Sequence, residues 1–198
     1  GVQATALNQD DLPENLQWLS EFYPIQKPGE VDLASFDAFA FVDGNVPYRF
    51  GNAADSLGSD RPLYMIDHHP EPSELFEEMV SETSKSSTCE LVYDLYMEHD
   101  ERQLDPDTSR ALYVGIMTDT GSYQFSSVSP ATMRAGAMLL EKGGFTPNEI
   151  AEPVYSVKKM KQLKLLSMAL DSIESYADGQ ITTISITRGM FEQTETSK

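Results

Sequence analysis

The stretch LYMIDHHP, residues 63–70, decides how the rest of the chain is interpreted. Its apolar run, Leu63 to Ile66, predicts a buried strand that ends abruptly in an acid, two adjacent imidazoles and a proline. Strands of open α/β sheets present ligand-binding groups at their carboxyl ends. Imidazole is a common ligand of zinc, manganese and similar ions, and a carboxylate such as Asp67 can fix the ring beside it. The alternative is a surface turn in which His68 and His69 are simply solvated.

Two further carboxylates stand at the ends of apolar elements. Asp43 follows the apolar run Phe36–Val42, which is too short for a helix and predicts a second buried strand. Asp119 ends a segment that we expect to be helical, because Asp105 is suited to its N-cap and Gly121 to its C-terminal stop. Mixed Asp and His ligation suits manganese, iron or zinc better than calcium. Pairs of such ions activate water and neutralise phosphoryl oxygens.

The order of elements predicts an α/β protein. Two strands joined by a short helical crossover over residues 47–57 indicate a parallel βαβ unit. Residues 70–86 are expected to form a loop, residues 122–126 a short strand, and residues 181–187 a later strand. Helices are predicted at residues 13–19, 87–98, 105–118, 129–141, 146–155 and 157–176. The predicted architecture is a parallel sheet with helices on both faces, followed by a long linker helix and the start of a second α/β domain.

Composition excludes several classes of protein. Asp and Glu number 32 against 14 Lys and Arg, which gives a formal charge of −18 and disfavours general binding to nucleic acid or anionic membranes. No apolar run is long enough to span a bilayer. The single cysteine, Cys89, excludes an intramolecular disulfide, and we expect a cytoplasmic protein. The dense acidity also raises the hypothesis of a high-salt cytoplasm.

Other titratable residues are given ordinary roles. Cys89 lies in the first turn of a predicted helix, where burial as a small hydrophobe is preferred to a nucleophilic role. His99 ends the same helix, where a histidine interacts favourably with the helix dipole. The acidic strip Glu71–Glu78 is interpreted as a solvated face.

The motifs together resemble those of the DHH-family phosphoesterases, in particular the RecJ-like branch that contains nano-RNases and pAp phosphatases. The resemblance covers nearly the whole chain. It rests on motifs in the right order: Pro13–Leu16, the Asp43…Arg49…Gly51 spacing, Asp67-His68-His69, Ser87–Tyr93 and Gly115–Gly121.

The resemblance implies roles for individual residues. Asp43 would bridge two metal ions, and His68 and Asp119 would complete one of the two sites. His69 would contact the scissile phosphate or the leaving oxygen, Asp67 would orient the histidines, and Arg49 would bind substrate. These enzymes are similar in using Mn²⁺ to hydrolyse phosphomonoesters or short oligonucleotides, and the resemblance implies pAp, short oligonucleotides (nanoRNA) or cyclic dinucleotides as substrates. A short oligonucleotide or nucleotide phosphate is therefore the expected partner, with no membrane.

The chain also departs from the family pattern. The first motif, His-x-x-x-Asp-x-Asp, and most of the substrate-binding DHHA1 domain are absent. We therefore expect residues 1–156 to form a catalytic domain without its first motif, 157–177 a linker helix, and 178–198 the beginning of DHHA1. Such a chain should bind one metal ion at most and should have little activity alone. Because its apolar sheet edge and face would be uncovered, it should either self-associate as a homo-oligomer or be poorly soluble.

Two other functions remain open at this stage. One is a catalytically inactive DHH-like scaffold that binds nucleotides or partner proteins. The other is a manganese pyrophosphatase of the family II type, although the segments Pro13–Leu16 and Ser87–Tyr93 favour the RecJ-like branch.

Overall fold

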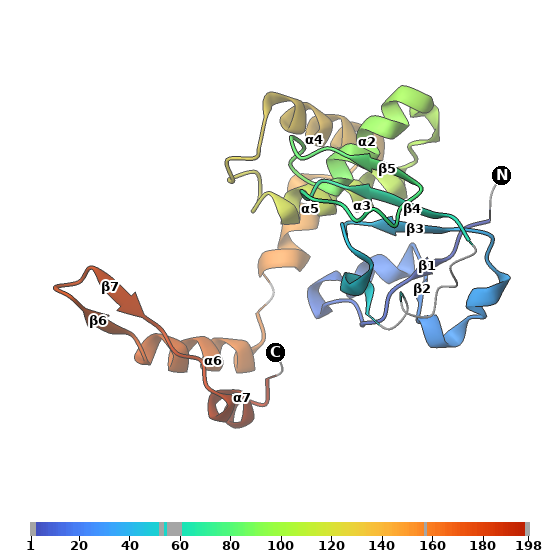
Figure 1. The fold of residues 1–198 in the computed structure, drawn as a ribbon. Coiled ribbons are helices and arrows are strands. Elements are labelled where there is room, and N and C mark those ends of the chain that lie inside the picture. The colour runs from blue at the N-terminus through green and yellow to red at the C-terminus, as the bar shows by residue number, and fades with distance from the viewer. Residues whose placement is uncertain (1–2, 52–53, 55–60, 157, 197–198) are drawn as a thin grey trace. The chain divides into compact units, whose positions relative to one another are not determined.

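The structure, a computed structural model, describes residues 3–51, 54, 61–156 and 158–196. The chain divides into two compact units, Gly1–Ile150 and Ala151–Lys198, and each is described by itself (Figure 1). The division falls close to the predicted start of the linker helix at Val157, which lies outside the described residues.

A parallel sheet of three strands, in the order β3-β4-β5, organises the first unit (Figure 1). Strand β3 (Phe39–Val42) pairs with β4 (Leu63–Asp67), with Phe41 opposite Met65. Strand β4 pairs in turn with β5 (Glu78–Ser81). The predicted parallel βαβ pairing is therefore confirmed, and both β3 and β4 deliver their polar residues to the same edge.

Strand β5 is a correction to the sequence interpretation, which assigned residues 70–86 to a loop. The strand has only Met79 and Val80 as apolar residues, which is too short a run to mark a buried strand, and all its residues are exposed. Strand β3 is also less buried than predicted, because only Phe41 of its residues is buried. An apolar cluster covers the sheet at this point, where Phe41 and Met65 pack with Phe76 and with Phe50. Phe50 belongs to η4 (Pro47–Phe50), the described part of the predicted crossover.

Three capped helices form the rest of this unit's core. Helix α2 (Thr88–His99) packs against β4, and α3 (Pro106–Asp119) lies between α2 and α4 (Pro130–Gly143). The side chains of Ser87, Asp105 and Ser129 each accept a hydrogen bond from a backbone N–H of the first turn, which for Asp105 is the cap predicted from the sequence. Their fully buried apolar side chains include Ile116 of α3 and Leu139 of α4.

Shorter elements complete the first unit. Strands β1 (Ala6–Leu7) and β2 (Ile25–Gln26) pair in parallel. Between them lies η1 (Glu14–Glu21), a 3₁₀ helix at the position of the short helix that the sequence predicts. The 3₁₀ turns η2 (Pro28–Glu30) and η3 (Leu33–Ser35) lead to β3, and η5 (Glu101–Gln103) joins α2 to α3. Helix α5 spans Pro147–Ala151.

Residues 122–126 do not form the predicted strand. Gly121, Ser122 and Tyr123 all have positive φ angles, of 55°, 60° and 63°. Three successive residues in the left-handed region cannot lie in an extended strand, so the alternation around Tyr123 and Phe125 belongs to a tight turn. The turn begins directly after α3 and is closed by the hydrogen bond from the Phe125 N–H to the Thr120 carbonyl.

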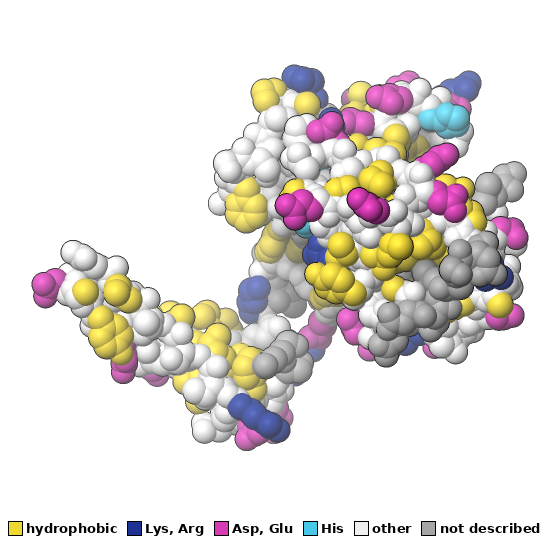
Figure 2. All heavy atoms as spheres, in the orientation of Figure 1, with side chains coloured by type: hydrophobic (Ala, Val, Ile, Leu, Met, Phe, Trp, Pro, Cys, Tyr) yellow, Lys and Arg dark blue, Asp and Glu magenta, His cyan; other side chains and the backbone are white. Residues whose placement is uncertain are grey.

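The second unit consists of small elements. A π-helical turn, η6 (Glu152–Ser156), precedes helix α6 (Met160–Asp171). Strands β6 (Glu174–Tyr176) and β7 (Ile181–Thr183) form an antiparallel hairpin, and α7 (Arg188–Thr194) follows. The helix predicted to reach Tyr176 therefore ends at Asp171, and α7 was not predicted at all. Hydrophobic side chains of this unit lie open on its surface (Figure 2).

The fold class predicted from the sequence, an α/β protein with a parallel sheet flanked by helices, is confirmed. Among the described residues, none of the helices combines the length and the hydrophobicity needed to cross a bilayer.

Candidate metal centre

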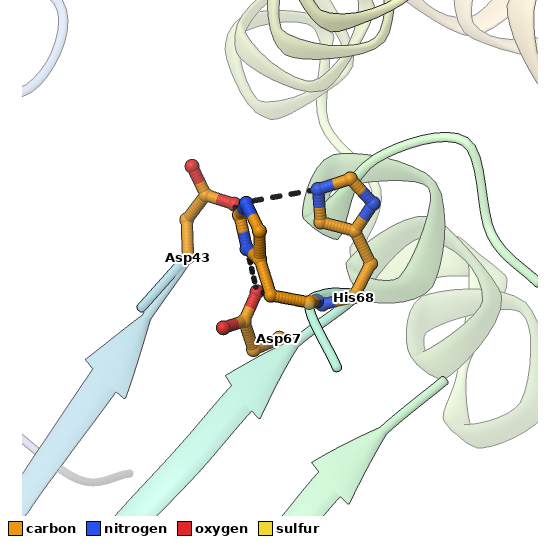
Figure 3. A group of neighbouring side chains, drawn as sticks. Asp43, Asp67 and His68 are labelled. Atoms are coloured by element: carbon orange, nitrogen blue, oxygen red, sulfur yellow. Dashed lines mark hydrogen bonds and ion pairs between the residues drawn. The ribbon is translucent and has the colours of Figure 1, made fainter. Parts of the chain in front are cut away.

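The candidate site lies at the carboxyl ends of β3 and β4, where Asp43, Asp67 and His68 point toward one another (Figure 3). One ligand atom from each of Asp43, Asp67, His68 and His69 lies within 4.8 Å of the others. Parallel pairing of the two strands explains this convergence, because the residues that follow them meet at one edge of the sheet.

The ring of His68 is held in one orientation by a contact at its Nδ1 atom, on the side away from the carboxylates. Its Nδ1 lies 3.2 Å from the carbonyl oxygen of Lys85, which can only accept a hydrogen bond. The proton of a neutral His68 therefore resides on Nδ1, and the lone pair of Nε2 points away from Lys85. This Nε2 faces two carboxylates, at 3.3 Å from Asp119 Oδ2 and 3.8 Å from Asp43 Oδ1. An imidazole fixed in this way by a carbonyl is typical of metal ligands.

Asp119 is the last residue of α3, and its side chain extends to the site. Partial burial raises the pKa of its carboxyl, and the Asp43 carboxylate adds to this effect while His68 opposes it. Two carboxylates and a lone pair directed at one point repel each other unless positive charge lies between them.

Asp67 organises the turn that carries the two histidines. Burial would raise the pKa of its carboxyl, but hydrogen bonds from the ring and backbone N–H of His69 outweigh burial, so the pKa is lowered. The Oδ1 atom accepts from His69 Nδ1 at 2.7 Å and from the N–H groups of His68 and His69. The other oxygen, Oδ2, is buried and receives no hydrogen bond from the part of the chain that the structure describes.

The backbone of Asp43 is unusual for a residue that follows a strand. Its φ angle is 62°, in the left-handed region that non-glycine residues rarely adopt. Strained conformations of this kind persist where the surrounding structure over-determines them, often at functional sites. Here the turn directs the Asp43 carboxylate at the two histidines, since its Oδ1 is 3.8 Å from His68 Nε2 and 3.9 Å from His69 Nδ1.

The donor set fits a divalent cation. It combines the free lone pair of His68, two facing carboxylates and an unsatisfied buried oxygen on Asp67. Imidazole together with carboxylate suits manganese, iron or zinc. Asp43, His68 and Asp119, the predicted ligands, are thus brought together by the structure. Their roles as ligands remain a prediction.

The other predicted site residues lie at different distances from this centre. His69 and Asp67 belong to it, as described above. Arg49 is exposed and donates a long hydrogen bond, 3.4 Å, to Asn45 Oδ1. Asn45 Nδ2 donates to the carbonyl of Pro70, directly after His69, at 2.7 Å. Arg49 is therefore linked to the turn after the histidines but does not contact them through this network.

Sequence reasoning missed the contribution of the segment Lys85–Thr88, at the start of α2. The carbonyl of Lys85 holds His68, and the hydroxyl of Thr88 donates to Asp43 Oδ1 at 2.8 Å. The capping pattern Ser87–Glu90 located the start of α2 but carried no signal for these long-range contacts.

Cys89 is partly buried, and the enclosure of its thiol, together with the charges of Asp43 and Asp119, raises the pKa of that thiol to about 12.

Comparisons with known proteins agree with the family resemblance. The chain is 30% identical over 102 residues to a protein of Bacillus subtilis named bifunctional oligoribonuclease and PAP phosphatase NrnA, covering 50% of this chain and 32% of that protein. An exopolyphosphatase-related protein of Bacteroides fragilis superimposes with a TM-score of 0.89 at 23% identity, over 98% of this chain and 59% of that one. A putative family II inorganic pyrophosphatase of Methanococcus jannaschii has a TM-score of 0.62 at 15% identity, over 96% and 66%.

No family model matches the chain. The chain spans about a third of the Bacillus subtilis protein and less than two thirds of the two solved structures. The motifs and the named relative agree with the resemblance to the DHH-family phosphoesterases, and the two solved structures share the fold of the chain.

Proposed function

We propose that this chain is the metal-binding part of a Mn²⁺-dependent phosphoesterase that hydrolyses pAp or short oligoribonucleotides. The observation that carries the proposal is the arrangement of His68, whose lone-pair nitrogen is directed at Asp43 and Asp119 by the carbonyl of Lys85. The name of the Bacillus subtilis relative, which joins oligoribonuclease and PAP phosphatase, supports this substrate class.

Three side chains would hold the ion: Asp43, His68 and Asp119. When bound, a divalent ion of this kind activates a water molecule and neutralises charge on a phosphoryl group. The same charge would let a chain of formal charge −18 attract an anionic substrate.

We propose that His69 acts on the substrate itself. Its Nδ1 is bound to Asp67, which leaves Nε2 as the nitrogen that can donate a proton or a hydrogen bond. The buried Asp67 carboxylate, 0% exposed, accepts from this Nδ1 and fixes the orientation of the ring. We propose that His69 donates to a phosphoryl oxygen or to the leaving oxygen, and that Arg49 contributes positive charge at the rim.

The described residues direct one imidazole nitrogen and two carboxylates at a common point, which is fewer ligands than a pair of ions requires. We therefore propose that this stretch binds one ion and has little hydrolytic activity by itself. A longer protein that supplies further ligands would be the active form.

The test is a calorimetric titration with Mn²⁺ of the chain, of His68→Ala and of His99→Ala. His99 is the matched control, since it is the remaining histidine and lies at the far end of α2, outside the cluster. The titration is run at about 0.3 M KCl to screen general binding to the acidic surface. We expect binding that is lost in His68→Ala and retained in His99→Ala. Equal binding in all three proteins would refute the site.

Substrate class is tested with a protein that contains the complete domains. Release of phosphate from pAp, cleavage of a diribonucleotide and hydrolysis of pyrophosphate are measured side by side with Mn²⁺. Activity on pyrophosphate alone would favour the pyrophosphatase alternative. Metal binding without hydrolysis of any of the three substrates would favour the inactive scaffold.

A further inference from the structure

The segment Lys85–Glu90 lies against the metal centre and contacts it at two points. The carbonyl of Lys85 holds the ring of His68, as described above. Thr88, the first residue of α2, is 3% exposed, and its hydroxyl lies 2.8 Å from Asp43 Oδ1 and 3.4 Å from Asp67 Oδ1. A hydroxyl has one proton, so the shorter contact, to Asp43, is the hydrogen bond that it makes.

We propose that Thr88 is a positioning residue, which orients the Asp43 carboxylate for the metal ion. This inference rests on the proposed function, because it concerns the same site. Asp43 needs such a partner, since its side chain is 60% exposed and its backbone lies in the left-handed region. The described hydrogen bond to its carboxylate comes from Thr88, a residue of a different element. The Thr88 hydroxyl occupies one lone pair of Oδ1 and leaves the second directed toward the histidines.

The hydroxyl of Thr88 is not used for capping its own helix. Ser87 is the N-cap of α2 and accepts the hydrogen bond from the N–H of Glu90 at 3.0 Å. Thr88 follows the cap, at a position whose side chain has no capping role. Its contact with Asp43 joins residues 45 positions apart in the sequence and is therefore a tertiary contact.

A buried network holds Thr88 in place. Glu90, buried on the same helical turn, accepts hydrogen bonds from the backbone N–H of Ser86 at 3.0 Å and from the Thr132 hydroxyl of α4 at 2.9 Å. The Ser86 hydroxyl also donates to this carboxylate. These bonds anchor the start of α2 to α4, so the Thr88 hydroxyl is presented from a fixed backbone rather than from a mobile loop.

Partners that orient metal ligands are worth about 10–100-fold in metal affinity. The test compares Thr88→Val, which keeps the shape and removes the hydroxyl, with Thr88→Ser, which keeps the hydroxyl. Thr146→Val is the matched control, because Thr146 also donates its hydroxyl to a carboxylate, that of Glu149, away from the site. Circular dichroism and urea unfolding establish that each variant is folded.

The first readout is the dissociation constant for Mn²⁺ by calorimetry. We expect about 10-fold weaker binding in Thr88→Val. We expect a change of less than about 3-fold in Thr88→Ser and Thr146→Val, because both keep the Asp43 hydrogen bond. Binding by Thr88→Val that equals wild type would overturn the inference.

The second readout needs no metal. Three-bond Hα–Hβ couplings of Asp43, measured by NMR in the absence of metal, report whether its carboxylate holds one χ1 rotamer. We expect a single rotamer in wild type and Thr88→Ser, and averaged couplings in Thr88→Val. If no protein binds Mn²⁺ but the couplings differ in this way, the proposed function fails while the positioning role stands. Unchanged couplings in Thr88→Val would reject the positioning role whatever the metal does.

Discussion

Helices α3 and α6 have similar lengths and both carry several large apolar residues, yet they differ in what they bury. Helix α3 buries Leu112, Tyr113, Val114, Ile116 and Met117, whereas Ala169 is the residue that α6 buries. Met160, Leu163, Leu166 and Leu170 of α6 are exposed. The comparison shows that an apolar stripe predicts a helix and the face it will use. Whether this face becomes buried depends on other segments of the chain, which the stripe itself does not reveal.

The largest expected effect concerns the apolar residues of the two units. Leu139→Ala removes a side chain that is 0% exposed, and we expect a loss of about 2–5 kcal/mol in the free energy of unfolding. Leu166→Ala truncates a side chain that is 52% exposed, and we expect a change within about 0.5 kcal/mol. Urea unfolding monitored by circular dichroism measures both. A large loss in Leu166→Ala would mean that α6 is covered in solution, and dependence on protein concentration would identify a second copy as the cover.

Two glutamates give the next contrast. Glu90→Ala removes a buried carboxylate and leaves the Ser86 and Thr132 groups without their acceptor, so we expect a loss of about 1–3 kcal/mol. Glu192→Ala breaks an exposed pair with Arg188 four residues earlier on α7, where we expect at most about 0.5 kcal/mol. Urea unfolding of both variants at low and at high KCl concentration provides the measurement. Equal losses would show that the Glu90 network contributes no more than a surface pair.

A helix cap should act similarly in the two units. Asp105 accepts from the N–H of Thr108 at the start of α3, and Thr187 accepts from the N–H of Met190 at the start of α7. We expect replacement of each by Ala to cost about 1 kcal/mol, because a cap is a local interaction that does not depend on core burial. Amide hydrogen exchange in the first turn of each helix measures this. A much larger loss at Asp105 would mean that the cap also positions Asp119 through α3.

Thiol reactivity provides the smallest effect near neutral pH. Burial raises the pKa of Cys89 to about 12, so its thiolate is scarce at about pH 8 and we expect alkylation at least about 100-fold slower than in urea. A cysteine introduced by Leu166→Cys, in a Cys89→Ala background, should react at the rate of a free thiol. Iodoacetamide labelling followed by mass spectrometry measures both rates.

The raised pKa of the Cys89 thiol also lowers the stability of the folded protein at high pH. Its folded pKa lies above the unfolded value of about 8.5, so the unfolded state releases the proton first as pH rises. Stability should therefore be unaffected below about pH 8 and should fall between about pH 9 and 12 in wild type but less in Cys89→Ala. Fast labelling of the native thiol at about pH 8 would contradict both expectations.

The sequence was most informative where a signal is local. The ends of the helices in the first unit can be predicted to within a few residues. The N-termini are marked by the caps Ser87, Asp105 and Ser129, and the C-termini of α3 and α4 by Gly121 and Gly144. Strand β4 was marked by its apolar run. The site residues Asp43, His68 and Asp119 could be named because each follows such an element and because the motifs resemble a known family.

Features that depend on tertiary context could not be predicted in this way. Strand β5 forms because β4 offers it an edge, although its own residues are exposed. The segment after Asp119 alternates like a strand but turns through three left-handed residues. The hydrogen bond from Thr88 to Asp43 joins distant positions, and no periodicity records it.

The left-handed backbone of Asp43 has a consequence for the substitutions that this position can accept. Glycine, asparagine and aspartate tolerate a φ of 62° better than other residues. Replacement of Asp43 by asparagine would therefore keep the turn and the strand pairing while it removes one negative charge from the centre. A single substitution at this position can thus abolish metal binding without disturbing the fold. A β-branched residue would disturb both the fold and the site, because it does not tolerate a positive φ. An asparagine or a glycine at the equivalent position of a relative would therefore indicate a protein that has lost the activity and kept the fold.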